Sequence, residues 1–81
     1  MGDYISMEIR DLNLQNIQIR LRTAIKESGI QQKEIAKQIG VSAQTVSKYM
    51  KTDVFPALDT LAKICIVIDV SADYILGIEQ K

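Results

Sequence analysis

The sequence predicts an all-α domain of five short helices, on three observations. Apolar residues recur every three or four positions through most of the chain, which is the spacing of one helix face. Glycines and capping residues divide those stretches into short lengths. Alternation of apolar and polar residues, the signal of a strand, occurs only before Asp11. The expected helices are about Asn16 to Ser28, Gln32 to Ile39, Ala43 to Met50, Ala57 to Ile68, and Ala72 to Leu76.

The first three expected helices have clear start and stop signals. Asn16 or Asn13 suits the cap of the first helix, and Gly29 ends it. Gly40 stops the second helix, and Ser42 suits the N-cap of the third. The residues expected to face inward are Ile17, Leu21, Ala24, Ile25 and Ser28, then Ile35, Ala36 and Ile39, then Val46, Tyr49 and Met50.

The last two helices follow a loop that runs from Lys51 to Pro56. Proline suits the start of a helix, so the fourth helix is expected directly after Pro56. Ser71 caps the short fifth helix and Gly77 closes it. The expected core stripe of the fourth helix is Leu58, Leu61, Ala62, Cys65 and Ile68.

The residues before the first helix give only a weak signal of secondary structure. Ile5, Met7 and Ile9 alternate with polar residues, which is a weak strand signal. A single strand has no partner in the chain. The segment is therefore an arm that pairs with another chain, or a frayed terminus.

Charge is distributed unevenly along a chain whose net charge is zero. Residues 20–52 contain seven of the ten basic side chains and two of the ten acidic ones. Both flanks are acidic. A basic middle segment is typical of a surface that binds phosphate groups. The net charge of the whole chain does not reveal this segment.

Composition excludes several function classes. The chain has no His and one Cys, and no paired-carboxylate or phosphate-loop pattern, so no enzyme, metal site or cofactor is expected. One Cys forms no disulfide within the chain, and the sequence shows no secretion signal, which together favour a cytoplasmic location. Cys65 is expected to be a small buried apolar residue. No apolar run is long enough to span a membrane.

The second and third helices meet at a turn of only three residues, "GVS". Two helices joined by a short turn that contains glycine form a helix-turn-helix. A tight turn places Gly40 at positive φ, and the helix crossing needs a small residue at Ala36 and a filling residue at Val46. A third helix placed in this way projects from the body and fits the major groove of DNA.

Two stretches carry a resemblance to a known family. They are "IRLRTAIKESGIQQKEIAKQIGVSAQTVSKYM" and "FPALDTLAKICIVIDVSADYILG", and they resemble the phage-repressor and Cro (Xre-type) helix-turn-helix family over about Ile17 to Gly77. The resemblance implies a five-helix, lambda-repressor-like fold. The expected division is a short N-terminal arm (1–15), a helix-turn-helix domain (16–78) and a C-terminal tail (79–81).

The resemblance also implies roles for individual residues of this chain. The expected contacts with base edges are Ala43, Gln44, Thr45 and Lys48. The expected contacts with phosphates are Gln32, Ser42, Ser47 and Lys51, of which Ser47 lies between the two faces and suits either role. Gln pairs with adenine, Lys donates to guanine, and the methyl groups of Ala43 and Thr45 suit a thymine methyl.

The chain departs from the family pattern at several places. Gln31 stands where a Ser or Thr cap is frequent, so the second helix is expected to start less firmly. Asp69 replaces a frequent Gly or Asn at the end of the fourth helix and would adopt the left-handed conformation at some cost. Ile66 is apolar where the family has an exposed charge, which indicates an oligomer surface.

These features together predict a sequence-specific, double-stranded DNA-binding transcriptional regulator. It is expected to be a repressor that binds an inverted-repeat operator as a homodimer. The candidate dimer surface is Ile66, Tyr74 and Ile75. The alternative is a protein-interaction module, or an antitoxin-type component, that works mainly through a regulatory protein partner. Its candidate surfaces are the acidic C-terminal face and the N-terminal arm.

Overall fold

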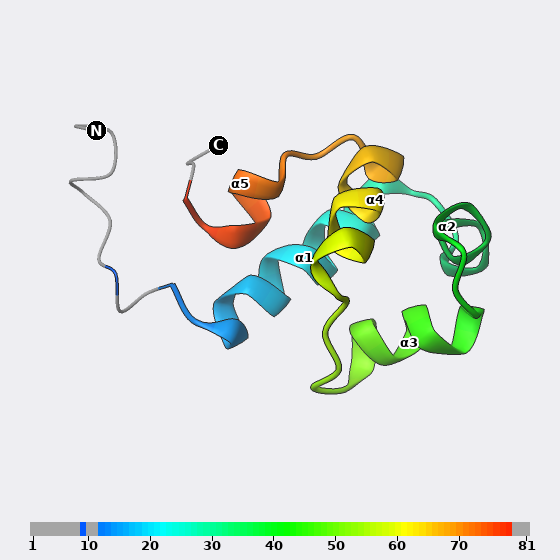
Figure 1. Ribbon diagram of the computed structural model, residues 1–81, viewed down its shortest axis with the longest axis horizontal. Helices are drawn as coiled ribbons and strands as arrows, with labels where there is room; N and C mark the ends of the chain where they lie inside the picture. The colour runs from blue at the N-terminus through cyan, green and yellow to red at the C-terminus, as the bar shows by residue number, and fades with distance from the viewer. Residues whose placement is uncertain (1–8, 10–11, 79–81) are drawn as a thin grey trace.

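The computed structural model of the chain describes residue 9 and residues 12–78, and it confirms the all-α class (Figure 1). The helices are α1 (Leu14–Ser28), α2 (Gln32–Ile39), α3 (Ala43–Lys51), α4 (Leu58–Ile68) and α5 (Ala72–Leu76). The described part of the chain contains no strand. The strand considered for the N-terminal arm falls on residues outside that part.

Helix α1 begins two residues earlier than the sequence predicted. Asn13, the second of the two candidate caps, accepts a hydrogen bond at its Oδ1 from the backbone N–H of Asn16, at 2.9 Å. The cap satisfies one of the amides that the first turn leaves without an intrahelical partner. The helix therefore starts at Leu14.

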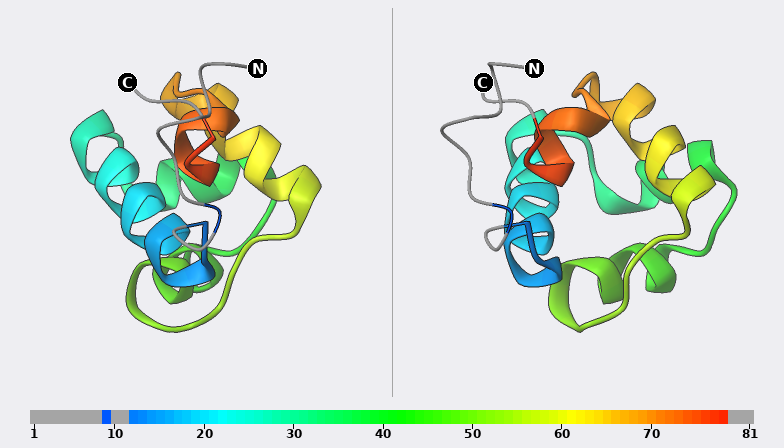
Figure 2. Two further views of the ribbon diagram at one scale, coloured as in Figure 1. Left: turned by 90° about the vertical axis from the view of Figure 1, so that its left-hand side faces the viewer. Right: turned by 60° about the vertical axis from the view of Figure 1, so that its left-hand side comes forward.

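The core lies where α1, α2, α3, α4 and α5 converge on one buried cluster. Its members are Leu21, Ala24, Ile25, Ile35, Ala36, Ile39, Val46, Tyr49, Leu61, Ile64, Cys65, Ile68 and Ile75. Helix α2 packs against both α3 and α4, and α5 packs against α1. The views agree that α3 runs along the edge of the molecule opposite α5 (Figures 1 and 2). One face of α3 is therefore left uncovered.

The buried face of α4 differs from the predicted stripe. Leu58 is 84% exposed and Ala62 is also exposed, whereas Ile64, which the prediction omitted, is completely buried. The buried face is Leu61, Ile64, Cys65 and Ile68. Leu58 has the right helical phase, but it is the first residue of α4 and lies beyond the end of the core. Ala62 is one residue out of phase with that face.

Four of the five helices end at a residue with positive φ. These residues are Gly29, Gly40, Asp69 and Gly77. Asp69 has φ 58°, the left-handed conformation that the sequence predicted for it. Helix α3 is the exception, because it ends at Thr52 with φ −130° and ψ 179°. None of the helices in the described part of the chain has the length and apolarity needed to cross a membrane.

Candidate nucleic-acid interface

The turn between α2 and α3 has the tight geometry of a helix-turn-helix. Gly40 has φ 80°. Its N–H and that of Val41 both donate to the carbonyl oxygen of Ala36, at 2.9 and 3.0 Å. Ala36 on α2 is 2% exposed and Val46 on α3 is completely buried, so both side chains lie in the core. The turn fixes the direction in which α3 leaves α2.

The hydroxyl groups of Ser42 and Thr45 lie at the N-terminus of α3. Ser42 Oγ accepts from the backbone N–H of Thr45 at 3.0 Å, which makes Ser42 the N-cap. The hydroxyl oxygens of the two residues lie 2.8 Å apart and share a hydrogen bond. The amides of the first turn have no partner within the helix and favour an anion at this end.

The uncovered face of α3 carries the polar residues that the sequence singled out. Gln44, Lys48 and Lys51 are exposed and follow the i, i+4, i+7 spacing of one helix face. Ala43 is exposed beside them. Thr45 and Ser47 are half-buried at the edges of this face. The opposite side of α3 is formed by Val46 and Tyr49, which are buried in the core.

The start of α2 holds another residue that the sequence singled out. Gln32 is its first residue and is half-buried. Gln31 occupies the N-cap position without a side-chain hydrogen bond to the helix, as its residue type predicted. The amides at the start of α2 therefore lack a side-chain cap, and a phosphate oxygen would suit them.

Five of the seven basic side chains in the middle segment are exposed lysines. They are Lys26, Lys33, Lys37, Lys48 and Lys51. The two arginines have structural roles instead. Arg20 Nε donates to the carbonyl oxygen of Ile75 at 2.9 Å, and Arg22 Nε donates to that of Tyr49 at 2.9 Å. The basic segment therefore supplies fewer charges to a ligand than the sequence count indicates.

Sequence reasoning missed two residues that contact the end of α3, Gln18 and Arg22. Gln18 is 7% exposed, and its Nε2 donates to the carbonyl oxygen of Thr52 at 2.7 Å. The position of Gln18 in the sequence could have indicated this role. Gln18 lies three residues before Leu21 and seven before Ile25, on the apolar face of α1. A polar residue on a core stripe indicates a specific buried hydrogen bond.

The structure corrects the candidate dimer surface. Ile66 is 81% exposed, but Tyr74 is half-buried and Ile75 is completely buried. Ile75 is part of the core, on the side of α5 that packs against α1, so it contributes no surface. The side chain of Ile75 faces inward. Because α5 has only five residues, periodicity did not show which of its sides is buried.

Two titratable groups in the core have raised pKa values. Burial raises the pKa of the Cys65 thiol, and burial also raises the pKa of the Tyr49 phenol, because a charged form is poorly solvated there. Among residues 9 and 12–78, no three His, Cys, Asp or Glu side chains gather closely enough to hold a metal ion.

Comparison with known proteins agrees with this geometry. The model of a helix-turn-helix family matches residues 21–75, most of the described chain. The chain belongs to the Xre/Cro-type helix-turn-helix family of DNA-binding transcriptional regulators. It is 34% identical over 61 residues to the HTH-type transcriptional regulator ImmR of Bacillus subtilis (strain 168), an alignment covering 75% of this chain and 48% of ImmR. The chain thus spans about half the length of that relative. No solved structure matches the chain significantly.

Proposed function

We propose that the chain binds double-stranded DNA sequence-specifically and regulates transcription, with α3 as the recognition helix in the major groove. The observation that carries this proposal is the stripe of Gln44, Lys48 and Lys51 on the uncovered face of α3. The opposite face of the same helix is locked into the core by Val46 and Tyr49. A helix that presents polar side chains from a fixed position is what major-groove reading requires.

The chemistry of the exposed face assigns roles to its members. Gln44 suits the two hydrogen-bonding groups of adenine, and Lys48 suits the acceptors of guanine. Ala43 and Thr45 present methyl groups to thymine. Because the Thr45 hydroxyl already bonds to Ser42, its methyl group is the better candidate for base contact. The residues proposed to contact phosphates are Gln32, Ser42, Ser47 and Lys51.

We further propose that the chain acts as a repressor, as a two-fold homodimer on an inverted repeat. Two recognition helices reach successive major grooves when half-sites lie roughly 34 Å apart. Exposed apolar residues favour association, and two of them are candidates for the dimer contact. Ile66 is 81% exposed on α4, and Leu58 is 84% exposed at the start of the same helix. Leu58 also borders an apolar groove lined by Leu14, Ile17, Leu21, Phe55, Pro56, Leu61 and Leu76.

Charge substitutions show which of these two candidate surfaces forms the dimer contact. Leu58→Glu and Ile66→Glu each place a charge on one candidate surface without touching the exposed face of α3. Sedimentation equilibrium of both variants, alone and with operator DNA, identifies the surface. The variant that lowers the dimer fraction marks the contact. Equal dimer fractions in both variants and the unsubstituted chain would contradict both assignments.

Selection from a random duplex pool tests the proposed function. The purified chain is incubated with the pool at two salt concentrations, and bound duplexes are sequenced. Enrichment of one inverted repeat at both concentrations is the expected result. Retention of DNA without enrichment of any sequence, lost at the higher concentration, would contradict sequence-specific binding by the chain alone.

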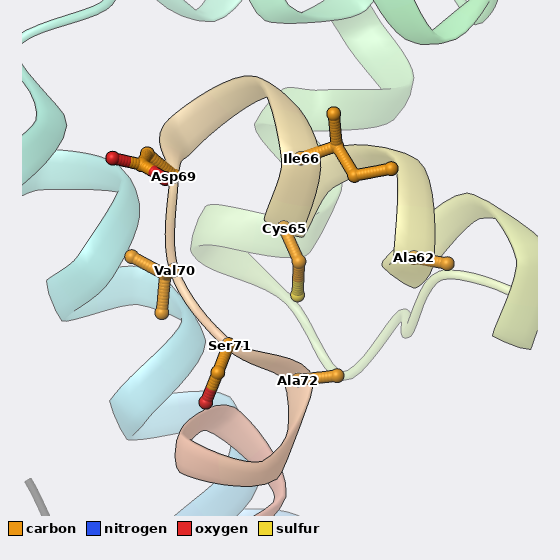
Figure 3. A pocket seen from close by; sticks show the side chains of 7 residues that line it. All are labelled: Ala62, Cys65, Ile66, Asp69, Val70, Ser71 and Ala72. Carbon is orange, nitrogen blue, oxygen red and sulfur yellow. The ribbon is translucent and has the colours of Figure 1, made fainter.

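A second candidate function is binding of a regulatory protein partner, including an antitoxin-type role. The favouring observation is a shallow apolar depression at the turn between α4 and α5, lined by Ala62, Cys65, Ile66, Asp69, Val70, Ser71 and Ala72 (Figure 3). The figure shows Ile66 pointing outward from α4, while Cys65 points toward α5. If this role dominates, the purified chain binds no duplex even at low salt.

A further inference from the structure

We propose that Gln18 and Arg22 on α1 are positioning residues for DNA recognition, because they fix the C-terminal end of α3 to the body of the protein. This inference rests on the proposed function, since it concerns how the recognition helix is presented to DNA. Neither side chain belongs to the exposed face of α3. Both act through backbone atoms of that helix and of the residue that follows it.

The end of α3 differs from every other helix end in the structure. Helices α1, α2, α4 and α5 each finish at a residue with positive φ, a conformation that lets the chain bond back to its own last carbonyls. Thr52 is extended instead. Its N–H and its hydroxyl both donate to the carbonyl oxygen of Lys48, each at 2.9 Å. Thr52 thus donates both of its hydrogen bonds to the Lys48 carbonyl and none to the carbonyls that follow it.

Side chains from α1 supply the missing donors. Arg22 Nε donates to the carbonyl oxygen of Tyr49 at 2.9 Å, and a terminal nitrogen of the same guanidinium donates to that of Thr52 at 2.7 Å. Gln18 Nε2 donates to the Thr52 carbonyl as well, at 2.7 Å. The positive charge of Arg22 lies at the negative end of the helix dipole, which adds to the stabilisation. Three hydrogen bonds therefore join two elements about thirty residues apart in sequence.

With these bonds, α3 is fixed at both ends. The turn at Gly40 fixes its N-terminus, and the donors from α1 fix its C-terminus. Without them, apolar packing of Tyr49 and Met50 would be left to hold the second half of the helix against the core. Hydrogen bonds to base edges need a donor–acceptor distance of about 2.7–3.2 Å and a nearly linear angle, and they weaken steeply when the angle falls below about 120°. Among the residues proposed to contact bases, Lys48 lies nearest the freed end and would lose its alignment first.

The test compares Arg22→Gln with Arg22→Lys and with the control Lys26→Gln. Lys26 is an exposed residue of α1 with no role in the contact, so its substitution removes the same charge from the same helix. Arg22→Lys keeps the charge and loses the planar two-pronged donor. Each variant is examined by amide hydrogen exchange without DNA, and by titration with the selected operator and a random duplex across a salt series. Urea unfolding verifies that each variant is folded.

The expected result for Arg22→Gln has three parts. Exchange of the Thr52 and Val54 amides becomes faster, while that of the Ile64 amide in α4 does not change beyond the difference in global stability. The dissociation constant for the operator rises about tenfold, which is the size of one lost hydrogen bond between the charged Lys48 side chain and a base. The slope of affinity against salt stays that of the unsubstituted chain, because no phosphate contact is removed. The exchange rates and operator affinity of Arg22→Lys lie between those of Arg22→Gln and those of the unsubstituted chain. Lys26→Gln leaves the exchange rates unchanged.

Two results would overturn the positioning role alone. One is unchanged operator affinity and unchanged exchange in Arg22→Gln. The other is a salt slope reduced by about one, which would make Arg22 a direct phosphate contact. Failure of the unsubstituted chain to bind any duplex would instead overturn the proposed function, and the positioning role with it. The behaviour of the unsubstituted chain thus separates the two failures.

Discussion

The hydroxyl groups of Ser42 and Thr45 share one hydrogen bond, 2.8 Å long, at the N-terminus of the recognition helix. Whichever hydroxyl donates, the other keeps its proton and can donate to a further acceptor. Ser42 Oγ also accepts from the Thr45 amide, so its capping role is complete within the protein. The pair thus caps α3 and keeps one hydroxyl proton that could be donated to a phosphate oxygen.

Substitution of Ser42 separates the capping role from the DNA role. Ser42→Ala should lower the free energy of unfolding by about 1 kcal/mol, because the cap is lost, and should weaken DNA binding. Ser42→Asp keeps a capping oxygen and should leave stability near that of the unsubstituted chain. Its negative charge should nevertheless weaken DNA binding at least as much as alanine does. Urea unfolding and operator titration measure the two effects. Tight operator binding by Ser42→Asp would mean that no phosphate lies at this position.

Lys51→Ala should weaken binding to all duplexes by a similar factor. Lys51 is exposed at the last position of α3, where a long cationic side chain suits the phosphate backbone better than a base edge. Titration at several salt concentrations should show a slope reduced by about one. Lys63→Ala is the control, since Lys63 is an exposed lysine on α4 away from this face. A change of base preference in Lys51→Ala would contradict the phosphate role.

Gly77→Ala should destabilise the protein more than Gly29→Ala does. Both glycines have positive φ, 85° and 72°, so alanine costs about 1–2 kcal/mol of conformational strain at either position. At Gly77 a Cβ atom would also lie 2.8 Å from Cζ of Arg20, whose Nε bonds to Ile75, whereas nothing lies within 4 Å at Gly29. Urea unfolding of the two variants gives the difference. Equal losses would show that Arg20 moves aside without cost.

Stability should fall as the pH becomes strongly alkaline. Burial raises the pKa values of Cys65 and Tyr49 in the folded protein, so the unfolded chain loses these protons at lower pH than the folded chain does. The unfolded state then binds fewer protons, and the free energy of unfolding decreases as pH rises past the ordinary pKa values of a thiol and a phenol. Urea unfolding across this range measures the decrease. Cys65→Ala should show a shallower dependence on pH than the unsubstituted chain. An identical dependence in both would rule out a contribution from the thiol.

Local signals explain which parts of the fold the sequence predicted. Helices α2 and α5 were placed correctly at both ends, because Gly40 and Gly77 stop them and because the residues before them break the helical pattern. The start of α1 was predicted two residues too late, since the sequence offered two asparagines as caps and the structure has Asn13 as the cap. The all-α class followed from the same local signals, whereas family membership followed from the resemblance of two long stretches to a known family.

Long-range packing explains what the sequence did not predict. Periodicity defines a helix face but not where the core ends along it, so Leu58 was placed inside although it is 84% exposed. Ile75 was assigned to a surface because five residues are too few to fix a helical phase. The bond from Gln18 to Thr52 spans 34 residues and depends on how α1 meets α3, which no local pattern encodes.

The measurement that tests the central claim most directly is the base preference of Gln44→Ala. The operator obtained by selection is varied at every half-site base pair, and the affinities of the unsubstituted chain and the variant are measured at one salt concentration. If α3 reads bases from its exposed face, the variant loses discrimination at one base pair, by about 1–3 kcal/mol, and keeps it at the others. An equal loss of affinity for every duplex, with all preferences intact, would contradict the assignment of this face to base recognition.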